Sequence, residues 1–252
     1  MGGLIQVQGV VISAMPIGEY DKRIVLLTKE RGKISAFARG ARKANSLYMA
    51  AANSFVFGEF TLYEGRNSYT LKDVKVLHQF VELASAQPEV YYGYYFLELA
   101  EYFASEGTQE REMINLLYVS VKALLNTGIE NRLIRCVFEL RIMTEQGLAP
   151  SLFHCVSCGR EQQTEGFFSW EQNGVLCSAC ASGIKNALKL SGAALYTMQY
   201  IVTASLGKLY TFRVSEQVLT ELESLIHTYV RYHVERNMKS LDILNMMCGN
   251  IS

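Results

Sequence analysis

The chain has 252 residues, of which 50% are hydrophobic and 19% charged, with a formal net charge of zero. This composition excludes a disordered or low-complexity chain, which would contain fewer apolar residues and lie further from neutrality. At roughly 100–200 residues per domain, the length allows one large domain or a few small ones, each with its own core.

The first 80 residues are predicted to form β structure. Five runs rich in β-branched and aromatic residues are separated by turn residues. In the third run, Ile34, Ala36 and Ala38 alternate with Lys33, Ser35, Phe37 and Arg39, which indicates a strand with one buried face. The runs cover 5–14, 20–28, 33–40, 55–63 and 68–77.

The segment 41–54 lies between the third and fourth predicted strands and can form a short helix over its Ser-Leu-Tyr-Met-Ala-Ala-Ala stretch. Five strands with an element at this position fit an OB-type barrel, a fold that binds single strands on its strand 2–3 face and in its loops. A five-stranded barrel or sandwich without a ligand is the alternative.

Charge is distributed unevenly along the chain. Residues 1–80 contain 11 Lys and Arg against 6 Asp and Glu, and residues 81–252 contain 13 against 18. Within 22–43, eight cations accompany a single acid, Glu30. Such asymmetry favours a nucleic-acid-binding module, although a solvated strand face or a partner-binding surface produces the same pattern.

The remaining chain is predicted to be mostly helical. Apolar residues recur at spacings of three and four in 88–106, 110–126 and 130–147, with Cys136 among the core residues of the last segment. Two later helices have N-capping serines, Ser191 and Ser215. We therefore expect an α+β protein with domains over 1–80 and 81–252.

Four cysteines form two Cys-x-x-Cys pairs separated by eighteen residues: Cys155, Cys158, Cys177 and Cys180. This spacing predicts one structural zinc ion bound by four thiolates, in a zinc-finger insertion over 153–182. Asn173 and Gly174 favour a hairpin turn that brings the two pairs together, and Gly159 eases the turn of the first pair. His154 is a substitute ligand that four thiolates make unnecessary.

Disulfides and a catalytic redox pair are the alternatives to zinc. Residues 1–18 lack the charged start of a signal peptide, so we expect a cytoplasmic protein without stable disulfides. A redox site needs only one Cys-x-x-Cys pair. Residues 190–207 are uncharged but too polar for a membrane span, so no membrane is expected as a partner.

The sequence contains no motif for an enzyme. Phosphate-binding, nucleotide-binding, nucleophile-elbow and zinc-protease patterns do not occur, and the four histidines are scattered. A zinc site closed by four protein ligands leaves no position for a reactive water. We therefore assign no catalytic residue; a nuclease or other metal-dependent enzyme is the minor alternative.

Several segments together resemble the family of the bacterial DNA repair protein RecO, and the resemblance runs along nearly the whole chain. Two of them, 27–34 and 38–43, lie in the basic run. The others are Phe138-Glu139-Leu140-Arg141 leading to Gly147-Leu148-Ala149-Pro150, the two cysteine pairs around Gly174-Val175-Leu176-Cys177, and Lys239-Ser240-Leu241.

The resemblance implies an N-terminal OB-fold, a helical domain and a zinc-finger region. It further implies a recombination mediator, associated with the bacterial nucleoid, that binds single- and double-stranded DNA and anneals complementary strands. The implied partners are RecR, the C-terminal tail of single-strand-binding protein and, indirectly, RecA. A zinc-stabilised adaptor between proteins, without DNA affinity of its own, is the alternative.

The basic run supplies the candidate DNA contacts, because cations that track phosphates release counterions on binding. Phe37 shares a strand face with Arg39, so it either stacks on an unpaired base or packs under a loop. Leu47 and Tyr48 stand where family members often have a further Arg, and some members lack the cysteine pairs. The candidates are Lys22, Arg23, Arg31, Lys33, Phe37, Arg39, Arg42 and Lys43.

Overall fold

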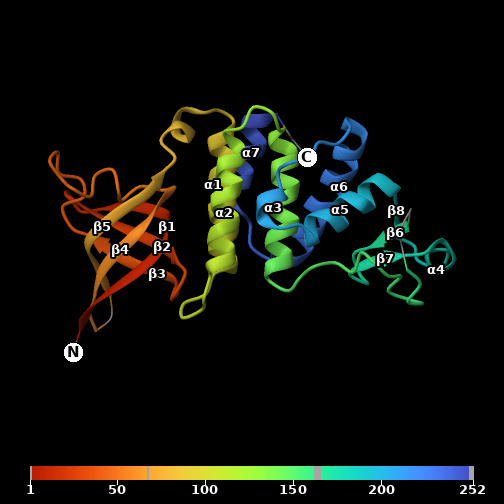
Figure 1. Cartoon of the computed structure of the whole chain (residues 1–252), viewed down its shortest axis with the longest axis horizontal. Helices are drawn as coiled ribbons and strands as arrows, with labels where there is room; N and C mark the ends of the chain where they lie inside the picture. The colour runs from red at the N-terminus through yellow and green to blue at the C-terminus, as the bar shows by residue number, and fades with distance from the viewer. Residues whose placement is uncertain (1, 67, 162–165, 250–252) are drawn as a thin grey trace. The chain divides into compact units, whose positions relative to one another are not determined.

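The computed structural model describes residues 2–66, 68–161 and 166–249 (Figure 1). The chain forms two compact units, which are described separately. Unit 1 comprises Met1–Leu125 with Met238–Ser252, and unit 2 comprises Asn126–Asn237. The sequence analysis places a domain boundary between residues 80 and 81, and this boundary stays a prediction.

Unit 1 contains a closed five-stranded barrel with the strand order β1-β2-β3-β5-β4, which confirms the predicted OB-type barrel. Strands β3 and β5 close it through a short parallel pairing of Ala36 with Tyr69 and of Phe37 with Thr70. The five strands are β1 (Gly3–Ile17), β2 (Asp21–Thr28), β3 (Gly32–Ala38), β4 (Val56–Glu64) and β5 (Tyr69–Gln79).

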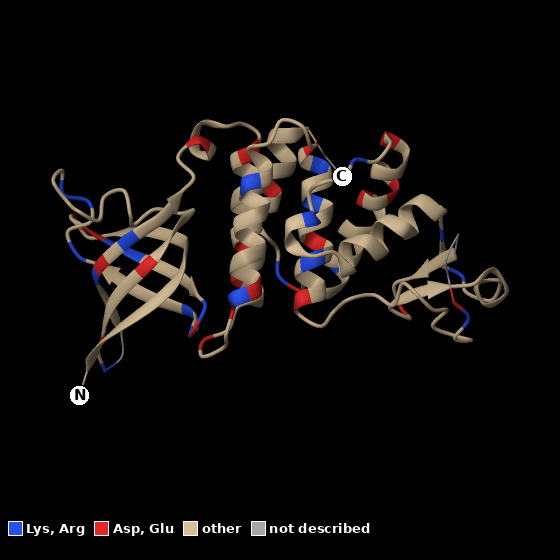
Figure 2. Ribbon diagram, in the orientation of Figure 1, with Lys and Arg blue, Asp and Glu red and all other residues tan. Residues whose placement is uncertain are grey.

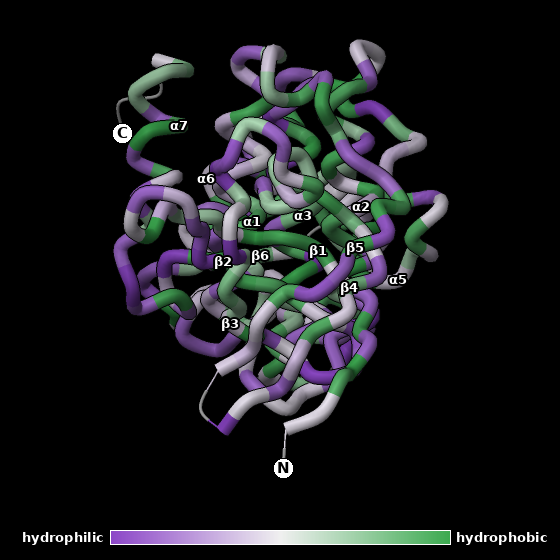
Figure 3. Tube along the Cα trace, turned by 90° about the vertical axis from the view of Figure 1, so that its left-hand side faces the viewer, coloured by the Kyte–Doolittle hydropathy of each residue, from purple (hydrophilic) through white to green (hydrophobic). Residues whose placement is uncertain are grey.

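The barrel interior is filled by the residues that alternation predicts. On β3, Ile34, Ala36 and Ala38 are buried, whereas Phe37 on the opposite face is exposed. Hydrophobic stretches along β1 are visible as green tube in Figure 3. The core consists of Val7, Val11, Ile24, Leu26, Ile34, Ala36, Ala38, Ala41, Ala52, Val56, Phe60, Leu62 and Leu71.

The segment between β3 and β4 forms successive turns, which corrects the expectation of a short helix there. The amides of Ser46 and Met49 each bond a carbonyl three residues back, and only Ala52 bonds four residues back, to Tyr48. One isolated helical bond cannot offset the cost of nucleating a helix. Buried Ala51 and Ala52 attach the end of this segment to the barrel.

Three helices and a 3-10 turn complete unit 1. Gly32, at the start of β3, has φ +65°, and a Cβ built there would lie 2.0 Å from the Ser105 carbonyl oxygen. A glycine is therefore required where the barrel meets the chain that follows α1. The elements are the turn Glu82–Ser85, α1 (Glu89–Phe103), α2 (Arg111–Leu124) and α7 (Lys239–Cys248).

Unit 2 consists of three longer helices and a small cysteine-containing sheet of order β7-β6-β8. Ser191 and Ser215 cap α5 and α6 as predicted, accepting bonds from Ala194 N and Val218 N. The elements are α3 (Asn131–Glu145), β6 (Gly166–Ser169), β7 (Gly174–Leu176), α4 (Ser178–Ala181), β8 (Leu188–Leu190), α5 (Gly192–Thr203), the 3-10 turn Leu206–Lys208 and α6 (Glu216–His233).

Candidate metal centre and candidate nucleic-acid interface

The four cysteines of the two pairs meet at one point, formed by the turn before β6 and the start of α4. Their Sγ atoms all lie within 4.8 Å of one another, and those of Cys158 and Cys177 are 3.8 Å apart. Two sulfurs bound tetrahedrally at about 2.3 Å to one zinc ion would be roughly 3.8 Å apart. A disulfide needs about 2.0 Å, so the geometry fits a shared metal ion instead.

Backbone hydrogen bonds hold the first cysteine pair in place. Gly159 has φ +74°, and its amide donates to the Cys155 carbonyl. The amide of Val156 donates to Val175 O, which joins the first pair to β7. Strands β6 and β7 form the predicted hairpin, whose turn ends at Asn173 with φ +56°. His154 is exposed and is not part of the four-sulfur cluster.

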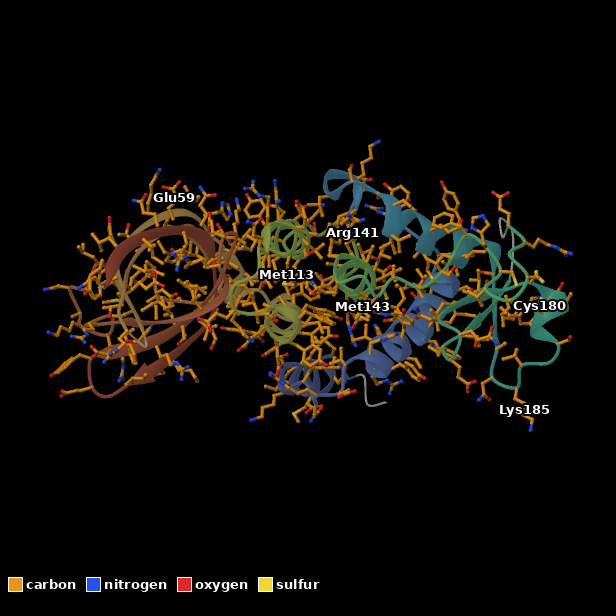
Figure 4. All side chains as sticks on the ribbon, turned by 90° about the horizontal axis from the view of Figure 1, so that it is seen from below. Glu59, Met113, Arg141, Met143, Cys180 and Lys185 are labelled. Atoms are coloured by element: carbon orange, nitrogen blue, oxygen red, sulfur yellow. The ribbon has the colours of Figure 1, made fainter. Side chains whose placement is uncertain are left out.

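The electrostatics of the site favour the thiolate, the form that binds metal, at Cys155 and Cys177. Burial acts to raise the pKa of Cys155, but backbone amides of Cys177, Cys158 and Ser157 outweigh it and lower that pKa to about 6. The backbone amide of Cys180 likewise lowers the pKa of Cys177. A hydrogen bond with Ser157 acts to lower the pKa of Cys180, but the neighbouring sulfurs of Cys177 and Cys158 outweigh it and raise that pKa to about 11. Four thiolates arranged in this way can bind a metal ion, and Figure 4 labels Cys180 at the site.

A second cysteine constellation lies in unit 2, where Cys136 Sγ is 3.9 Å from His227 Nε2 and Glu139 Oε2 lies 3.4 Å from the same nitrogen. Complete burial raises the pKa of the Cys136 thiol well above its usual value, and burial also lowers the pKa of His227. A buried neutral thiol is a poor nucleophile. Cys136 is therefore a core residue, as predicted.

The segment Phe138-Glu139-Leu140-Arg141 supports the helical packing of unit 2. Glu139 is fully buried and accepts a 2.8 Å bond from Arg135 Nε. Arg141, labelled in Figure 4, donates to the carbonyls of Ile201 and Val202 near the end of α5. The last carbonyls of a helix have no hydrogen-bond donor within the helix, and Arg141 supplies one here.

The basic run 22–43 does not form one patch, because β2 and β3 carry its members to opposite ends of the barrel. Strand β2 has eight residues, so its ends lie roughly 23 Å apart. Figure 2 shows the basic residues of the barrel in blue. One end is called the cationic end here and contains Lys22, Arg39, Arg42 and Lys43.

Two turns of the chain build the cationic end. The amide of Arg42 donates to Tyr20 O, and its guanidinium donates to Gly18 O at 2.9 Å. Lys43 Nζ lies 5.4 Å from the centre of the Tyr20 ring, a contact that the sequence analysis missed. The turn between β1 and β2 is thereby joined to the segment after β3.

Positive charge at the cationic end is not fully compensated by the protein. Partial burial and the nearby charge of Arg42 lower the pKa of Lys22, whose Nζ bonds Ala52 O and the side chain of Asn53. The carboxylate of Asp21 accepts the amide of Gly40. Arg39 is exposed and forms no hydrogen bond or ion pair with any residue that the structure describes.

At the opposite end, Arg31 and Lys33 have partners within unit 1. Arg31 forms a 2.9 Å ion pair with Glu64, and its pKa is raised by a hydrogen bond with Tyr69 and by the Glu64 carboxylate. Lys33 Nζ donates to the carbonyl of Glu101 on α1. Both side chains are half-buried. The structure does not bring these two residues together with the cationic end.

Arg23 and Phe37 occupy the outer face of the barrel, directly opposite each other on β2 and β3. Arg23 is exposed and its Nε donates to Ser35 Oγ, and 37% of Phe37 is exposed. Phe37 therefore does not pack into the barrel core.

Within the described residues, no helix is both long and apolar enough to cross a membrane.

The fold and the two candidate sites define an α+β protein in which an OB-type barrel is followed by helices and a four-cysteine module. Family models match residues 1–80 as "Recombination protein O N terminal" and residues 88–242 as "Recombination protein O C terminal". The chain therefore belongs to the RecO family, which has a role in DNA repair and recombination.

Curated relatives agree with this assignment over nearly their whole length. The DNA repair protein RecO of Acetivibrio thermocellus is 30% identical over 243 residues, which cover 96% of this chain and 97% of the relative. That of Symbiobacterium thermophilum is 31% identical over 247 residues, which cover 97% and 98%.

Proposed function

We propose that this protein is a non-enzymatic recombination mediator that binds single- and double-stranded DNA and anneals complementary strands. Together with RecR it would help to load RecA onto DNA coated by single-strand-binding protein, whose C-terminal tail it would contact. We infer these activities and partners from family membership and from the chemistry of the barrel. Its site of action would be the bacterial nucleoid.

The observation that carries the DNA-binding part is the excess of positive charge at the cationic end, where four cations accompany two acids, Glu19 in the turn between β1 and β2 and Asp21 directly after it. Lys22 and Arg42 lie close enough for one charge to lower the pKa of the other, so an anion bound between them would relieve this repulsion. From residue 31 to residue 58 the chain contains no Asp or Glu. A phosphate backbone is the polyanion that such a surface attracts, with release of counterions.

We propose that the DNA interface consists of the cationic end together with Arg23 and Phe37. Arg31 and Lys33 belonged to the predicted set, but their contacts with Glu64 and Glu101 suit them better to holding the barrel together. Annealing needs no bond chemistry. A cationic surface that holds two strands screens their mutual repulsion, and base pairing then supplies the driving force.

We propose that the four cysteines hold one zinc ion with a structural role. Sulfur ligands in two Cys-x-x-Cys pairs suit zinc, and four protein ligands close its coordination shell. Zinc bound there would supply folding free energy to the cysteine module and no open position for a reactive water. Under this proposal the metal supports the protein and takes no part in DNA chemistry.

Annealing of two complementary oligonucleotides, labelled with a fluorescent donor and acceptor, tests this function. The wild-type protein should accelerate annealing, and the variant R39A/R42A/K43A should lose most of the acceleration because three phosphate contacts are removed. The matched control K122A/K185A/K208A removes the same charge at exposed positions and should retain it. Oligonucleotides incubated with the protein and magnesium should remain intact on a gel.

The same samples distinguish the alternatives. An adaptor without DNA affinity would leave the anisotropy of a labelled oligonucleotide unchanged while still binding the tail peptide of single-strand-binding protein. A nuclease would shorten the oligonucleotide. Equal annealing by the two triple variants would remove the cationic end as the site.

A further inference from the structure

The outer face of the barrel carries one continuous row of side chains, and the strand register defines it. Arg23 pairs with Phe37, Phe37 with Thr70, Thr70 with Tyr63, and Tyr63 with Leu4. Residues directly opposite each other in a sheet point to the same face. The row therefore crosses all five strands in the order β2, β3, β5, β4 and β1.

Two aromatic rings of this row face solvent. The exposed fraction is 37% for Phe37 and 41% for Tyr63, and Leu4 at the end of the row is 68% exposed. Among the described residues, neither ring stacks on another aromatic ring. Thr70 separates them and is too small to cover either.

Each ring also has a cation beside it. Arg23 is the cross-strand neighbour of Phe37, and Lys72 Nζ lies over one face of the Tyr63 ring, 5.8 Å from its centre. The Glu64 carboxylate, next to Tyr63, accepts bonds from Arg31 and Tyr69. Exposed rings flanked by cations are the combination that binds single strands, because bases stack on rings while cations contact phosphates.

We infer that Phe37 and Tyr63 are two stacking platforms for the unpaired bases of a single strand that crosses β3, β5 and β4. Arg23 and Lys72 contact its phosphates. This inference rests on the proposed DNA-binding function and extends it from charge to base contact. It adds Tyr63 and Lys72, which the basic run does not include, and it gives the site a preference for single strands.

The spacing of the platforms fits a run of nucleotides. Phe37 and Tyr63 are separated by one intervening strand, so their backbones lie roughly 10 Å apart. At about 3.4 Å per stacked nucleotide, this distance corresponds to roughly three nucleotides. Paired bases are stacked within a duplex and present no free face to the rings. A duplex therefore contacts only the cations.

Binding titrations with three probes test the inference: a labelled 20-nucleotide thymidine strand, an abasic strand of the same length and charge, and a duplex. Y63A and F37A should each weaken binding to the thymidine strand about fivefold or more, the lower limit for loss of one stacked base. Binding to the abasic strand and to the duplex should change less than twofold. Y63F, which keeps the ring, should bind like the wild type.

Tyr196→Ala is the matched control, because it removes an aromatic ring that is 67% exposed on α5 in unit 2, outside the barrel. This variant should bind all three probes like the wild type. Thermal melting of each variant verifies that the barrel is folded. The fluorescence of 2-aminopurine placed within the thymidine strand should be quenched by the wild type and less so by Y63A, because quenching reports stacking directly.

Equal affinity of the wild type for the thymidine and abasic strands, with Y63A unchanged, would overturn the stacking inference while leaving the proposed DNA binding intact. Absence of binding to all three probes would overturn both. Weakened binding of Y63A to all three probes alike would assign Tyr63 to barrel structure and would also overturn the inference.

Discussion

Among the described residues, thirteen buried residues form the core of the barrel, whereas four form the core of the cysteine module, and two of those four are cysteines. Burial of large side chains such as Phe60 and Leu62 can stabilise the barrel without a metal ion. A core built from Cys155, Leu176, Cys177 and Ala181 is too small to do the same. This comparison predicts that apolar burial stabilises the barrel and that the proposed metal ion stabilises the cysteine module.

The two regions also differ in how their charge is used. Cations of the barrel remain exposed at the cationic end, where Arg39 has no partner in the described chain. Between two helices of unit 2, by contrast, Arg132 on α3 forms ion pairs with Glu216 and Glu223 on α6. The exposed cations of the barrel can attract a polyanion, in keeping with the proposed DNA binding.

Removing the metal should produce the largest effect and should separate the two regions. Cys177→Ser removes one of the four proposed zinc ligands, and structural zinc supplies on the order of 10–16 kcal/mol of apparent binding free energy. Residues 152–161 and 166–181 should lose protection from hydrogen exchange, and elemental analysis should show a fall from about one zinc per chain. DNA affinity should stay within about twofold.

Cys248→Ser is the matched control, because Cys248 lies on α7 outside the four-sulfur cluster, and it should keep the zinc. Protein that contains no zinc, has reduced thiols and still protects residues 152–161 and 166–181 from exchange would show that the module needs no metal.

Truncating the barrel core should have the complementary effect. Phe60 is completely buried, so Phe60→Ala should lower the free energy of unfolding of the barrel by about 3–5 kcal/mol. Urea unfolding should show this loss while the zinc content stays the same. Phe153→Ala, at a residue 41% exposed in unit 2, should change stability by less than about 0.5 kcal/mol. Loss of zinc from Phe60→Ala would mean that the two regions do not fold independently.

Alternation and spacing made much of this structure predictable. The strands follow from residues such as Ile34 and Ala36, whose side of the strand is set by the period of two. The metal site follows from two cysteine pairs, because each pair closes its own turn and only one hairpin must bring them together. Ser191 and Ser215 identified helix starts through contacts three residues away.

Other features depend on partners that are remote in the sequence. The basic run appears as one cluster along the chain, but a hairpin between β2 and β3 carries Arg31 and Lys33 away from Arg42. Glu64 and Glu101, which these two side chains contact, lie more than thirty residues further along the sequence. Tyr63 joins the outer row only through the barrel register, although its position beside buried Leu62 already indicated an outward side chain.

The dependence of DNA affinity on salt tests most directly whether the cationic end binds phosphates. For single strands the logarithm of the binding constant should fall with the logarithm of salt concentration with a slope of about −4, the value for about six phosphate contacts at about −0.7 each, from the cationic end, Arg23 and Lys72. R39A/R42A/K43A should reduce the slope to about −2, and K122A/K185A/K208A should leave it near −4. A slope that is the same in the wild type and both triple variants would contradict the cationic end as the DNA-binding site.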